Sequence, residues 1–278
     1  MDYKFKTEPY EHQLKALGAS HNKENFALFM EMGTGKSKVL IDNIAMLFDK
    51  GKINSAIIVA PKGVYRNWER QEIPTHMPEH VDYSILVWNP SSTSFMKEYA
   101  KFLKDEDKLK IFLINIDAFS TSRGTDIAKR FMISTQCLMA IDESTTIKTP
   151  TAKRTKTVCK MRTFAKYRRI LTGSPVTKSP LDLYTQCYFL DPDLLDFASY
   201  YSFKNRYAVM VSRSVATHSF KQIIDYQRLD ELEHKLNQFS YRVLKSECLD
   251  LPEKVYTKRY IEMTPEQKKM YVEMKNFA

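Results

Sequence analysis

The amino-acid sequence predicts an α/β protein built on a doubly wound parallel sheet with helices on both faces. Short apolar runs, many of them rich in β-branched residues, alternate with longer amphipathic stretches, as in parallel strands joined by crossover helices. The chain has 278 residues, of which 43% are hydrophobic, so it can bury a full core. A glycine loop follows one apolar run and two adjacent carboxylates follow another, which is typical of the carboxyl edge of such a sheet.

Six strands with helices between them account for the chain up to about residue 191. The expected strands are residues 26–30, 56–60, 84–88, 111–116, 137–141 and 169–172. The expected helices are residues 36–48, 64–75, 94–103, 127–133, 152–161 and 180–190. We therefore assign residues 1–191 to the sheet domain.

After Asp191-Pro192-Asp193 the alternation of strands and helices stops. The expected elements are a helix at 197–207, a hairpin of 208–215 and 220–226, a helix at 229–239, a strand at 255–263 and a helix at 265–276. Thr264 is a suitable N-cap for the last helix because its hydroxyl can accept an N–H of the first turn. We expect residues 192–278 to form an extension with a hairpin and helices, appended to the sheet domain.

The first motif that indicates chemistry is a glycine loop between an expected strand and an expected helix. It consists of Met32, Gly33, Thr34, Gly35, Lys36 and Ser37. Two glycines allow successive backbone N–H groups to face one anion, and the start of the helix adds its partial positive charge. Lys36 can reach the β- and γ-phosphates of a nucleotide, and Ser37 can hold Mg²⁺. The full phosphate-loop pattern requires a glycine at position 30, which is Met30 here, so the loop alone leaves a chance match open.

Asp142 and Glu143, which follow the expected strand 137–141, form the second motif. A buried apolar strand that ends in two carboxylates is a Walker B arrangement, in which Asp142 orients the Mg²⁺ held by Ser37 and Glu143 polarises the attacking water. An isolated Asp-Glu pair is more often part of a solvated turn. A phosphate loop in the same chain makes the Walker B interpretation the favoured one. The two motifs together predict a nucleotide-hydrolysing site with Lys36, Asp142 and Glu143 as catalytic residues.

The remaining composition argues against several classes of protein. No apolar run approaches membrane-spanning length, and the N-terminus lacks the apolar core of a signal peptide. The four cysteines are scattered without a C-x-x-C pair, which argues against zinc and disulfides and fits a reducing compartment. The six histidines are equally dispersed, and His12 is the only one that we expect near a site.

The positive charge is concentrated in one block. Nine basic residues and no acidic ones lie between Lys148 and Arg169, so the rest of the chain contributes only +1 of the net +10 (10 − 9). Such a block is either a polyanion-binding surface or a solvated helix face. The phosphate loop in the same chain favours the first reading and nucleic acid as the polyanion.

In their order and spacing these motifs resemble the ATPase motor of the superfamily-two helicases, most closely the Swi/Snf-like DNA translocases. The likeness runs through nearly the whole chain. Residues 8–13 resemble the Q motif of that family, which implies that Gln13 reads the adenine edge and that Tyr10 stacks on the ring. Residues 32–37 resemble its motif I, which commonly has methionine before the first glycine and lacks the distant one, so Met30 is accounted for. The resemblance implies a RecA-like P-loop NTPase fold with ATP and Mg²⁺ as cofactors.

Two segments resemble motifs that lie against the DNA backbone in this family. Residues 57–62, followed by Trp68 and Glu69, resemble motif Ia and make Lys62 a candidate phosphate contact. Residues 113–119 stand in the place of motif Ib, with Asn115 as a candidate contact, although the usual threonine-tyrosine pair is absent.

Two further segments resemble motifs II and III. Thr145 stands where the family often has histidine in motif II. Residues 146–148 resemble the arginine-hydrophobic-lysine sequel of that motif, and Lys148 is a further candidate nucleic-acid contact. Residues 171–175 resemble motif III, whose hydroxyls, here Thr172 and Ser174, link the γ-phosphate side of the site to the nucleic-acid side. Segments at 181–192, 241–245, 251–254 and 263–267 continue the Swi/Snf-like pattern.

The family motor has two RecA-like lobes, and the second carries arginines that complete the ATP site. Nothing after Met263 resembles those motifs. We therefore expect the first lobe with its inter-lobe extension, built as a fragment or truncated, with the second lobe absent here and present in the full-length chain.

The leading prediction is the ATP-binding lobe of an ATP-dependent DNA translocase or helicase that moves on duplex or branched DNA, as a monomer without zinc or membrane. A catalytically silent DNA- or protein-binding module and a small-molecule kinase stay open as alternatives. Whether such a motor separates strands or moves along a duplex, and whether it acts on DNA or on RNA, also stays open. The compact lobe without nuclear-localisation tails or chromatin-reading modules indicates a bacterial or phage protein acting in the cytoplasm.

Overall fold

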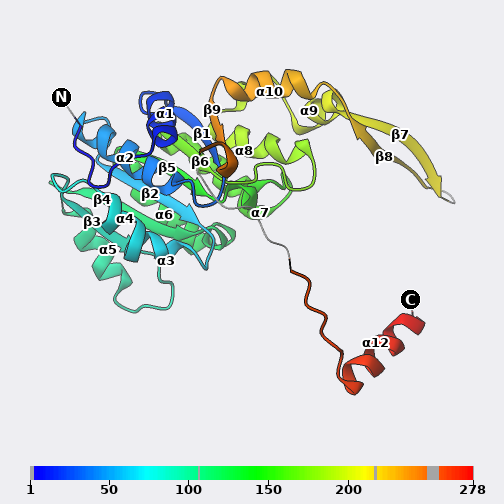
Figure 1. Cartoon of the computed structure of the whole chain (residues 1–278). Coiled ribbons are helices and arrows are strands. Elements are labelled where there is room, and N and C mark those ends of the chain that lie inside the picture. Colours follow the sequence, from blue (N-terminus) through cyan, green and yellow to red (C-terminus); the bar gives the residue numbers. More distant parts are fainter. Residues whose placement is uncertain (1–2, 106, 216–217, 249–256, 278) are drawn as a thin grey trace.

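The computed structural model describes residues 3–105, 107–215, 218–248 and 257–277. Its main body is a seven-stranded sheet whose neighbouring strands all run parallel, in the order β3-β4-β2-β5-β6-β1-β9 (Figure 1). The strands of this sheet are β1 (Asn25–Met30), β2 (Ser55–Ala60), β3 (Tyr83–Val87), β4 (Leu109–Asn115), β5 (Cys137–Asp142), β6 (Tyr167–Leu171) and β9 (Ser240–Val243).

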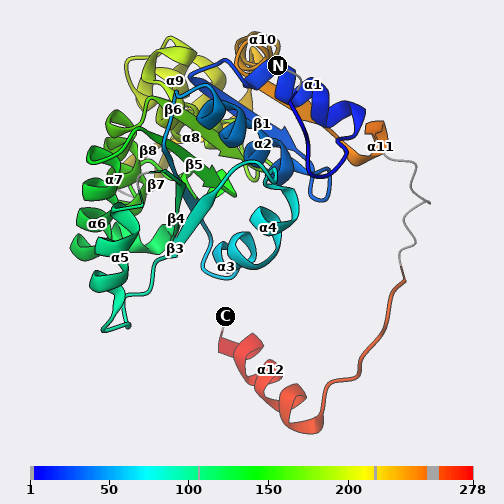
Figure 2. The same cartoon turned by 90° about the vertical axis from the view of Figure 1, so that its left-hand side faces the viewer.

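Helices cover both faces of the sheet. The α-helices are α1 (Glu11–Ser20), α2 (Lys36–Asp49), α3 (Tyr65–Asn67), α4 (Ile73–His76), α5 (Phe95–Leu103), α6 (Ser122–Ile133), α7 (Lys153–Met161), α8 (Leu183–Leu190), α9 (Tyr200–Tyr207), α10 (Leu229–Asn237), α11 (Lys245–Cys248) and α12 (Pro265–Phe277). Figure 2 shows α1, α2 and α4 on one face and α5, α6 and α7 on the other. The doubly wound α/β sheet is therefore confirmed. Within the described ranges, every helix is too short or too polar to span a lipid bilayer.

The hydrophobic core has two parts, one on each face of the sheet. Along β2, Ile57 and Val59 belong to the cluster under α5 and α6, whereas Ala56 and Ile58 belong to the cluster under α1 and α2. Every residue of β2 is buried, because a parallel strand covered on both faces needs apolar side chains at successive positions. This explains why the central strands stand out in the sequence as continuous apolar runs.

The six predicted strands are confirmed as β1 to β6, each within two residues of its expected bounds. The predicted hairpin is also confirmed: β7 (Ala208–Val215) and β8 (His218–Tyr226) pair antiparallel and form a separate two-stranded sheet that projects from the body (Figure 1). Helix α6 begins five residues earlier than predicted. The Thr121 hydroxyl accepts the Gly124 N–H and caps this helix, a signal that the apolar pattern alone does not contain.

The predicted helix at 64–75 is interrupted by a π-helical turn, η1 (Trp68–Glu72), between α3 and α4. Pro74, which has no N–H to donate, lies two residues after the end of this turn, in the first turn of α4. Turns of this kind are often found at functional sites. Here the π turn carries Trp68, whose indole reaches the end of β5.

Among the α-helices and strands of the described residues, α1, β9 and α11 were not predicted from the sequence. Strand β9 pairs with β1, so a segment from beyond residue 191 completes the edge of the main sheet. The domain division at residue 191 stays a prediction, but it does not separate the sheet from the rest of the chain. The predicted strand at 255–263 is wrong for residues 257–263, which form no strand; Tyr260 and Ile261 are 92% and 90% exposed there and have no neighbouring strand. Residues 255 and 256 lie outside the described residues.

Arg169, part of the basic block, is completely buried and holds α1, α2 and β6 together. Its guanidinium donates five hydrogen bonds, one to Asn43 Oδ1 and the others to the carbonyl oxygens of Ser20, Lys23, Glu24 and Arg168. This uses all five donors of an arginine side chain. Burial lowers its pKa to about 9, so the group is still charged at neutral pH. The reading of this residue as part of a polyanion-binding surface is therefore wrong.

Replacing Arg169 should destabilise the chain strongly. Arg169→Met removes all five of these hydrogen bonds from a buried site, three of them to carbonyl oxygens between Ser20 and Glu24, and we expect a loss of about 3 kcal/mol or more in the free energy of unfolding. Urea unfolding followed by circular dichroism measures this loss. Lys166→Met is the matched control from the same basic block, because the exposed Lys166–Glu24 pair should contribute only about 0–1 kcal/mol. Equal losses for the two variants would contradict the structural role of Arg169.

Candidate active site at the carboxyl edge of the sheet

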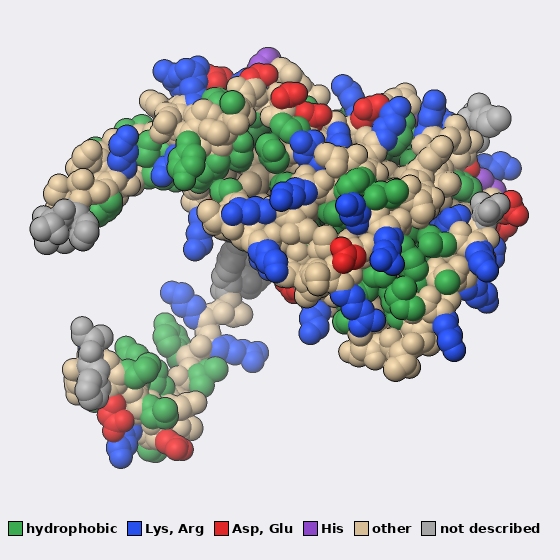
Figure 3. Space-filling model, turned by 180° about the vertical axis from the view of Figure 1, so that it is seen from behind, with side chains coloured by type: hydrophobic (Ala, Val, Ile, Leu, Met, Phe, Trp, Pro, Cys, Tyr) green, Lys and Arg blue, Asp and Glu red, His purple; other side chains and the backbone are tan. Residues whose placement is uncertain are grey.

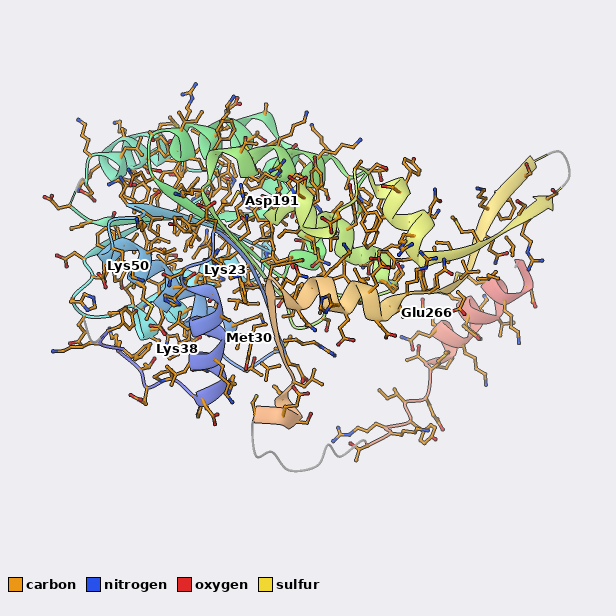
Figure 4. All side chains as sticks on the ribbon, turned by 90° about the horizontal axis from the view of Figure 1, so that it is seen from above. Lys23, Met30, Lys38, Lys50, Asp191 and Glu266 are labelled. Atoms are coloured by element: carbon orange, nitrogen blue, oxygen red, sulfur yellow. The ribbon has the colours of Figure 1, made fainter. Side chains whose placement is uncertain are left out.

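Four parallel strands end at the same edge of the sheet, where three of them lead into predicted site residues and the fourth into Lys245, which was not predicted as a site residue. Strand β1 leads into the glycine loop and α2, β5 ends at Asp142, and β6 leads into Thr172. Strand β9, on the other side of β1, leads into Lys245. In Figure 4, Met30 marks the end of β1, with β9 and α11 beside it. The parallel sheet therefore brings together residues that are up to 214 positions apart in sequence.

The glycine loop has the backbone that its sequence predicts. Gly33 and Gly35 have φ angles of +83° and +85°, a region that glycine occupies without strain. At Gly35 a Cβ atom would lie only 2.2 Å from Nε2 of Gln13, so a side chain is excluded there by packing as well. Helix α2 begins at Lys36. The loop therefore leads directly into a helix N-terminus, where backbone N–H groups favour an anion.

Two side chains of helix α1 contact the glycine loop. The Nε2 atoms of His12 and Gln13 lie 2.8 and 3.1 Å from the Thr34 carbonyl oxygen, and both side chains are buried. Gln13 Oε1 also accepts the backbone N–H of Tyr10. His12 is thus near the site, as predicted, while the amide of Gln13 is used to hold the loop. Its role in reading adenine stays a prediction. Tyr10 is 62% exposed and stacks on His12, so its outer face is open to a ligand.

Lys36, Glu143 and Thr172 meet at the centre of the site. The Lys36 Nζ lies 3.6 Å from Glu143 Oε1, and the Thr172 hydroxyl donates to Glu143 Oε2 over 3.3 Å. Lys36 is 9% exposed. Glu143 has a φ of +48°, an unfavourable angle for a residue with a side chain. Such strain is found at active sites, where surrounding contacts hold it in place.

Asp142 is buried beside this cluster. Its Oδ2 accepts the indole N–H of Trp68 over 3.0 Å, and its Oδ1 accepts the backbone N–H of Glu143. Burial raises the pKa of the Asp142 carboxyl above its ordinary value, although the Trp68 hydrogen bond acts in the opposite direction. Because its pKa is higher in the folded chain than in the unfolded chain, protonated Asp142 favours folding. This contribution to the free energy of unfolding is lost as the pH rises through the pKa of the folded state. An ionised Asp142 therefore costs folding free energy, a cost that a bound cation offsets.

The segment after β6 touches both motifs. Gly173 packs against the glycine loop: a Cβ atom there would lie 3.0 Å from the backbone nitrogen of Met32. The backbone N–H of Ser174 donates to the Thr172 hydroxyl, and the Ser174 side chain is exposed. Thr172 thus contacts Glu143 on one side and the exposed turn on the other. Its role in coupling, and that of Ser174, stay predictions.

The three predicted nucleic-acid contacts have different environments. Lys62 is exposed just after β2, at the same edge of the sheet. Asn115 uses its Oδ1 to accept the Ala118 N–H and caps the 3₁₀ turn η2 (Ile116–Ser120). Lys148 donates to Thr177 and lies 3.7 Å from Asp182 Oδ2. Lys62 is therefore the candidate with the most accessible ammonium group.

The basic block does not form one surface. Of its nine members, only Lys153, Lys156, Lys160 and Lys166 are exposed; the other five are partly or completely buried. Figure 3 shows Lys and Arg side chains spread over the rear face of the molecule rather than gathered in one continuous patch. The charge count alone therefore overstates the basic surface.

The donor atoms at the edge suit a hard cation. Ser37 is partly buried at the start of α2, and Asp142 has a buried carboxyl group, so both predicted ligands are oxygens, as Mg²⁺ prefers. Within the part of the chain that the structure describes, no group of three or more His, Cys, Asp or Glu side chains could hold a metal ion by itself. A cation here would rely on ligands from a bound nucleotide, as is usual for Mg²⁺.

The sequence reasoning missed three contributors to this site. It placed Trp68 beside the DNA-facing motif and gave it no contact with Asp142, 74 residues away. It noted the hydroxyls on either side of Gly173 and not the glycine itself, although a glycine between them indicates a close approach. It included Lys245 only in a segment that resembles the family and gave it no contact with the glycine loop. In the structure the backbone N–H of Lys245 donates to Glu31 Oε2 over 2.8 Å.

Comparison with known proteins agrees with this geometry. The family model described as SNF2-related domain matches residues 12–278. The chain is 26% identical over 243 residues to the chromatin remodeling factor mit1 of Schizosaccharomyces pombe, covering 87% of this chain and 15% of that protein. It is 27% identical over 277 residues to the chromatin-remodeling ATPase INO80 of Candida albicans, covering 96% of this chain and 19% of that protein. The chain thus spans less than one fifth of the length of these relatives.

A solved structure matches as well. The SWI2/SNF2 ATPase core of Sulfolobus solfataricus in complex with double-stranded DNA superposes with a TM-score of 0.67 at 25% identity, covering 99% of this chain and 54% of that one. The likeness to that ATPase core confirms the RecA-like fold.

The expected localisation, the cytoplasm of a bacterium or of a phage-infected host cell, is wrong. The curated relatives include chromatin-remodelling proteins of fungi and animals, human INO80 among them. The expectation was drawn from the lack of appended tails and chromatin-reading modules. A motor lobe has the same core with or without such additions, so their absence from 278 residues says nothing about the source.

The contact between Trp68 and Asp142 can be tested by titration. Trp68→Phe removes the hydrogen bond to Asp142 Oδ2, which favours the ionised carboxyl, so the pKa of Asp142 should rise further above its ordinary value. Carboxyl ¹³C NMR titration measures this pKa. Trp88→Phe, at the other tryptophan of the chain, is the matched control and should leave the Asp142 pKa unchanged. An unchanged or lower Asp142 pKa in Trp68→Phe would contradict the contact.

Proposed function

Because this chain belongs to the SNF2-related family, we propose that it is the ATP-binding lobe of a motor that couples ATP hydrolysis to movement on DNA. The observation that supports this most directly is the contact of Lys36, Glu143 and Thr172 at the carboxyl edge of the sheet. It joins the phosphate loop, the carboxylate pair and the segment after β6. A site that only held a nucleotide would not need Glu143 beside Lys36.

The proposed nucleotide site follows from this arrangement. The triphosphate of ATP lies along the loop from Met32 to Ser37, where backbone N–H groups, the start of α2 and Lys36 compensate its charge. Ser37 and Asp142 would hold Mg²⁺, which neutralises charge on the phosphate oxygens when it is bound. Tyr10 offers its exposed face to the adenine ring, and Gln13, which holds the loop, lies close enough to Tyr10 to contact the same ring.

Glu143 is the proposed general base. It accepts a proton from a water molecule while the water oxygen bonds to the γ-phosphorus and the bond to the ADP oxygen breaks. Lys36 pairs with one oxygen of the Glu143 carboxylate, and the Thr172 hydroxyl donates to the other. These two contacts hold the side chain of Glu143, whose backbone φ angle is unfavourable. Thr172 is also bonded to the backbone of exposed Ser174, which gives a short route from the γ-phosphate side to the surface.

We propose DNA as the track, on the surface around Lys62. The Sulfolobus ATPase core that this chain resembles is described in complex with double-stranded DNA. Lys62 is exposed at the same edge of the sheet as the nucleotide site, so a phosphate contact there lies close to the chemistry. Asn115 and Lys148 are proposed as secondary contacts, since both are partly engaged within the chain.

We also propose that a second RecA-like lobe completes the site in the full-length protein, and that residues after 191 lead toward it. The chain covers 54% of the matched ATPase core, and that share supports the proposal. An arginine supplied across the cleft contributes about 10³–10⁵ in rate in related NTPases. Hydrolysis by the 278-residue chain should therefore be slow.

Single-turnover hydrolysis tests the proposed chemistry. With protein in excess over labelled ATP and Mg²⁺, Glu143→Gln should lower the hydrolysis rate by about 10²–10⁴, the usual contribution of a general base, while ATP binding is kept. Glu266→Gln, on the exposed first turn of α12, is the matched control and should hydrolyse at the wild-type rate.

Equal rates for wild type and Glu143→Gln, with ATP bound by both, would reject the enzymatic proposal. The chain would then be a silent binding module of the same fold.

DNA binding is tested by its salt dependence. Lys62→Ala should weaken binding to a duplex and reduce the slope of log K against log salt by about 1, because one phosphate contact is lost. Fluorescence anisotropy of a labelled duplex measures both quantities. Lys52→Ala, exposed before β2 at the opposite edge of the sheet, is the control and should leave the slope unchanged. A slope in Lys62→Ala equal to that of the wild type would place the DNA elsewhere.

A further inference from the structure

We propose that Lys245 is a second phosphate-binding lysine of the nucleotide site, supplied by the segment after β9. This inference rests on the proposed ATP-binding function and adds a residue to it from outside the motifs that define the site. Three features of the structure lead to it. They are the register of β9, the position of the Lys245 side chain over Gly33, and the positive charge of the Lys245 ammonium group beside the loop.

The register of β9 brings Lys245 to the loop. Val243 pairs with Met30 in a parallel ladder, and the Glu31 N–H donates to the Val243 carbonyl oxygen over 3.0 Å. The segments that follow β1 and β9 therefore leave the sheet side by side. The backbone N–H of Lys245 then donates to Glu31 Oε2 over 2.8 Å. This bond ties the first residue of α11 to the residue that opens the glycine loop.

The side chain of Lys245 lies against the loop itself. A Cβ atom built on Gly33 would be 3.0 Å from its Cε and 3.1 Å from its Nζ. Gly33 therefore has two reasons to be glycine, its φ of +83° and the lysine that covers it. The ammonium group is within reach of an anion bound to the N–H groups of this loop.

Among the residues that the structure describes, no carboxylate compensates the charge of Lys245. Within the described residues, its ammonium has no Asp or Glu oxygen within the 4.0 Å of an ion pair, whereas the ammonium of Lys36 is paired with Glu143. The carboxylate of Glu31 is close, but it accepts the backbone N–H of Lys245. An uncompensated cation beside a loop of positive-φ glycines and a helix N-terminus suits a polyphosphate.

The residues next to Lys245 in sequence border a cavity beside Tyr10. Arg242 and Ser246 line this cavity of about 700 Å³ together with Tyr10 and His12, whereas Lys245 lies outside its lining, against Gly33. A nucleotide with its ring at Tyr10 and its phosphates on the glycine loop would extend from this cavity toward Lys245. Because the lysine lies at Gly33, it should act on the phosphates and not on the nucleoside.

Equilibrium binding of fluorescent nucleotides to the 278-residue chain tests this. Mant-ATP and mant-ADP with Mg²⁺, and mant-adenosine without phosphates, are titrated into the wild type and four variants. These are Lys245→Met, Lys245→Arg, Lys36→Ala and the control Lys52→Met. Lys245→Met should weaken mant-ATP binding by roughly ten- to hundredfold, the loss expected for one charge-assisted hydrogen bond, and leave mant-adenosine unchanged. Lys245→Arg should restore most of the affinity, and Lys52→Met should match the wild type. Thermal unfolding shows that each variant is folded.

The outcomes separate this inference from the proposed function. If Lys36→Ala loses mant-ATP but Lys245→Met binds it as tightly as the wild type does, the nucleotide site stands and the role of Lys245 is overturned. Equal weakening of mant-ATP and mant-adenosine in Lys245→Met would also overturn it, because the residue would then shape the cavity and not bind phosphate. If the wild type binds none of the nucleotides, both proposals fail.

Discussion

The parallel alignment of the seven strands is the constraint on which the functional contacts of this chain depend. Because β1, β5, β6 and β9 run in one direction, the loop from Met32 to Ser37, the pair Asp142 and Glu143, Thr172 and Lys245 all come to one edge. Helix α1 is placed over that edge by Arg169, whose buried guanidinium binds the turn between α1 and β1. A charge in the core thus sets the position of His12 and Gln13 on the glycine loop.

The same edge holds groups that are unfavourable by themselves. Asp142 is a buried carboxylate next to a second one, and Glu143 has a positive φ. Trp68, Lys36 and Thr172 offset part of this cost with hydrogen bonds and one ion pair. The arrangement favours a ligand that brings both a cation and phosphates, because the cation compensates Asp142 and the phosphates compensate the lysines. Strain and charge of this kind are typical of sites that bind a charged substrate.

Local sequence pattern predicted six of the seven strands of the main sheet and where the glycine loop and the carboxylate pair lie along the chain. Long-range packing accounts for the elements and contacts that it missed. Strands covered on both faces show themselves as apolar runs, and the spacing of Gly33, Gly35, Lys36 and Ser37 is local. Helix α1 was missed because its buried face includes His12, Gln13 and Ser20, which are polar. Strand β9 has four residues, too few for a periodic signal. Arg169 was counted with the surface charges because a charge count does not register burial.

The most direct test of a nucleotide-hydrolysing site at this edge is a crystal structure of the chain with Mg²⁺ and a non-hydrolysable ATP analogue. The account predicts the triphosphate along residues 32–37, with the cation between Ser37 and Asp142 and the γ-phosphate facing Glu143. An analogue bound elsewhere, for example in the cavity beside Tyr184 and Tyr188, with the glycine loop empty, would contradict it.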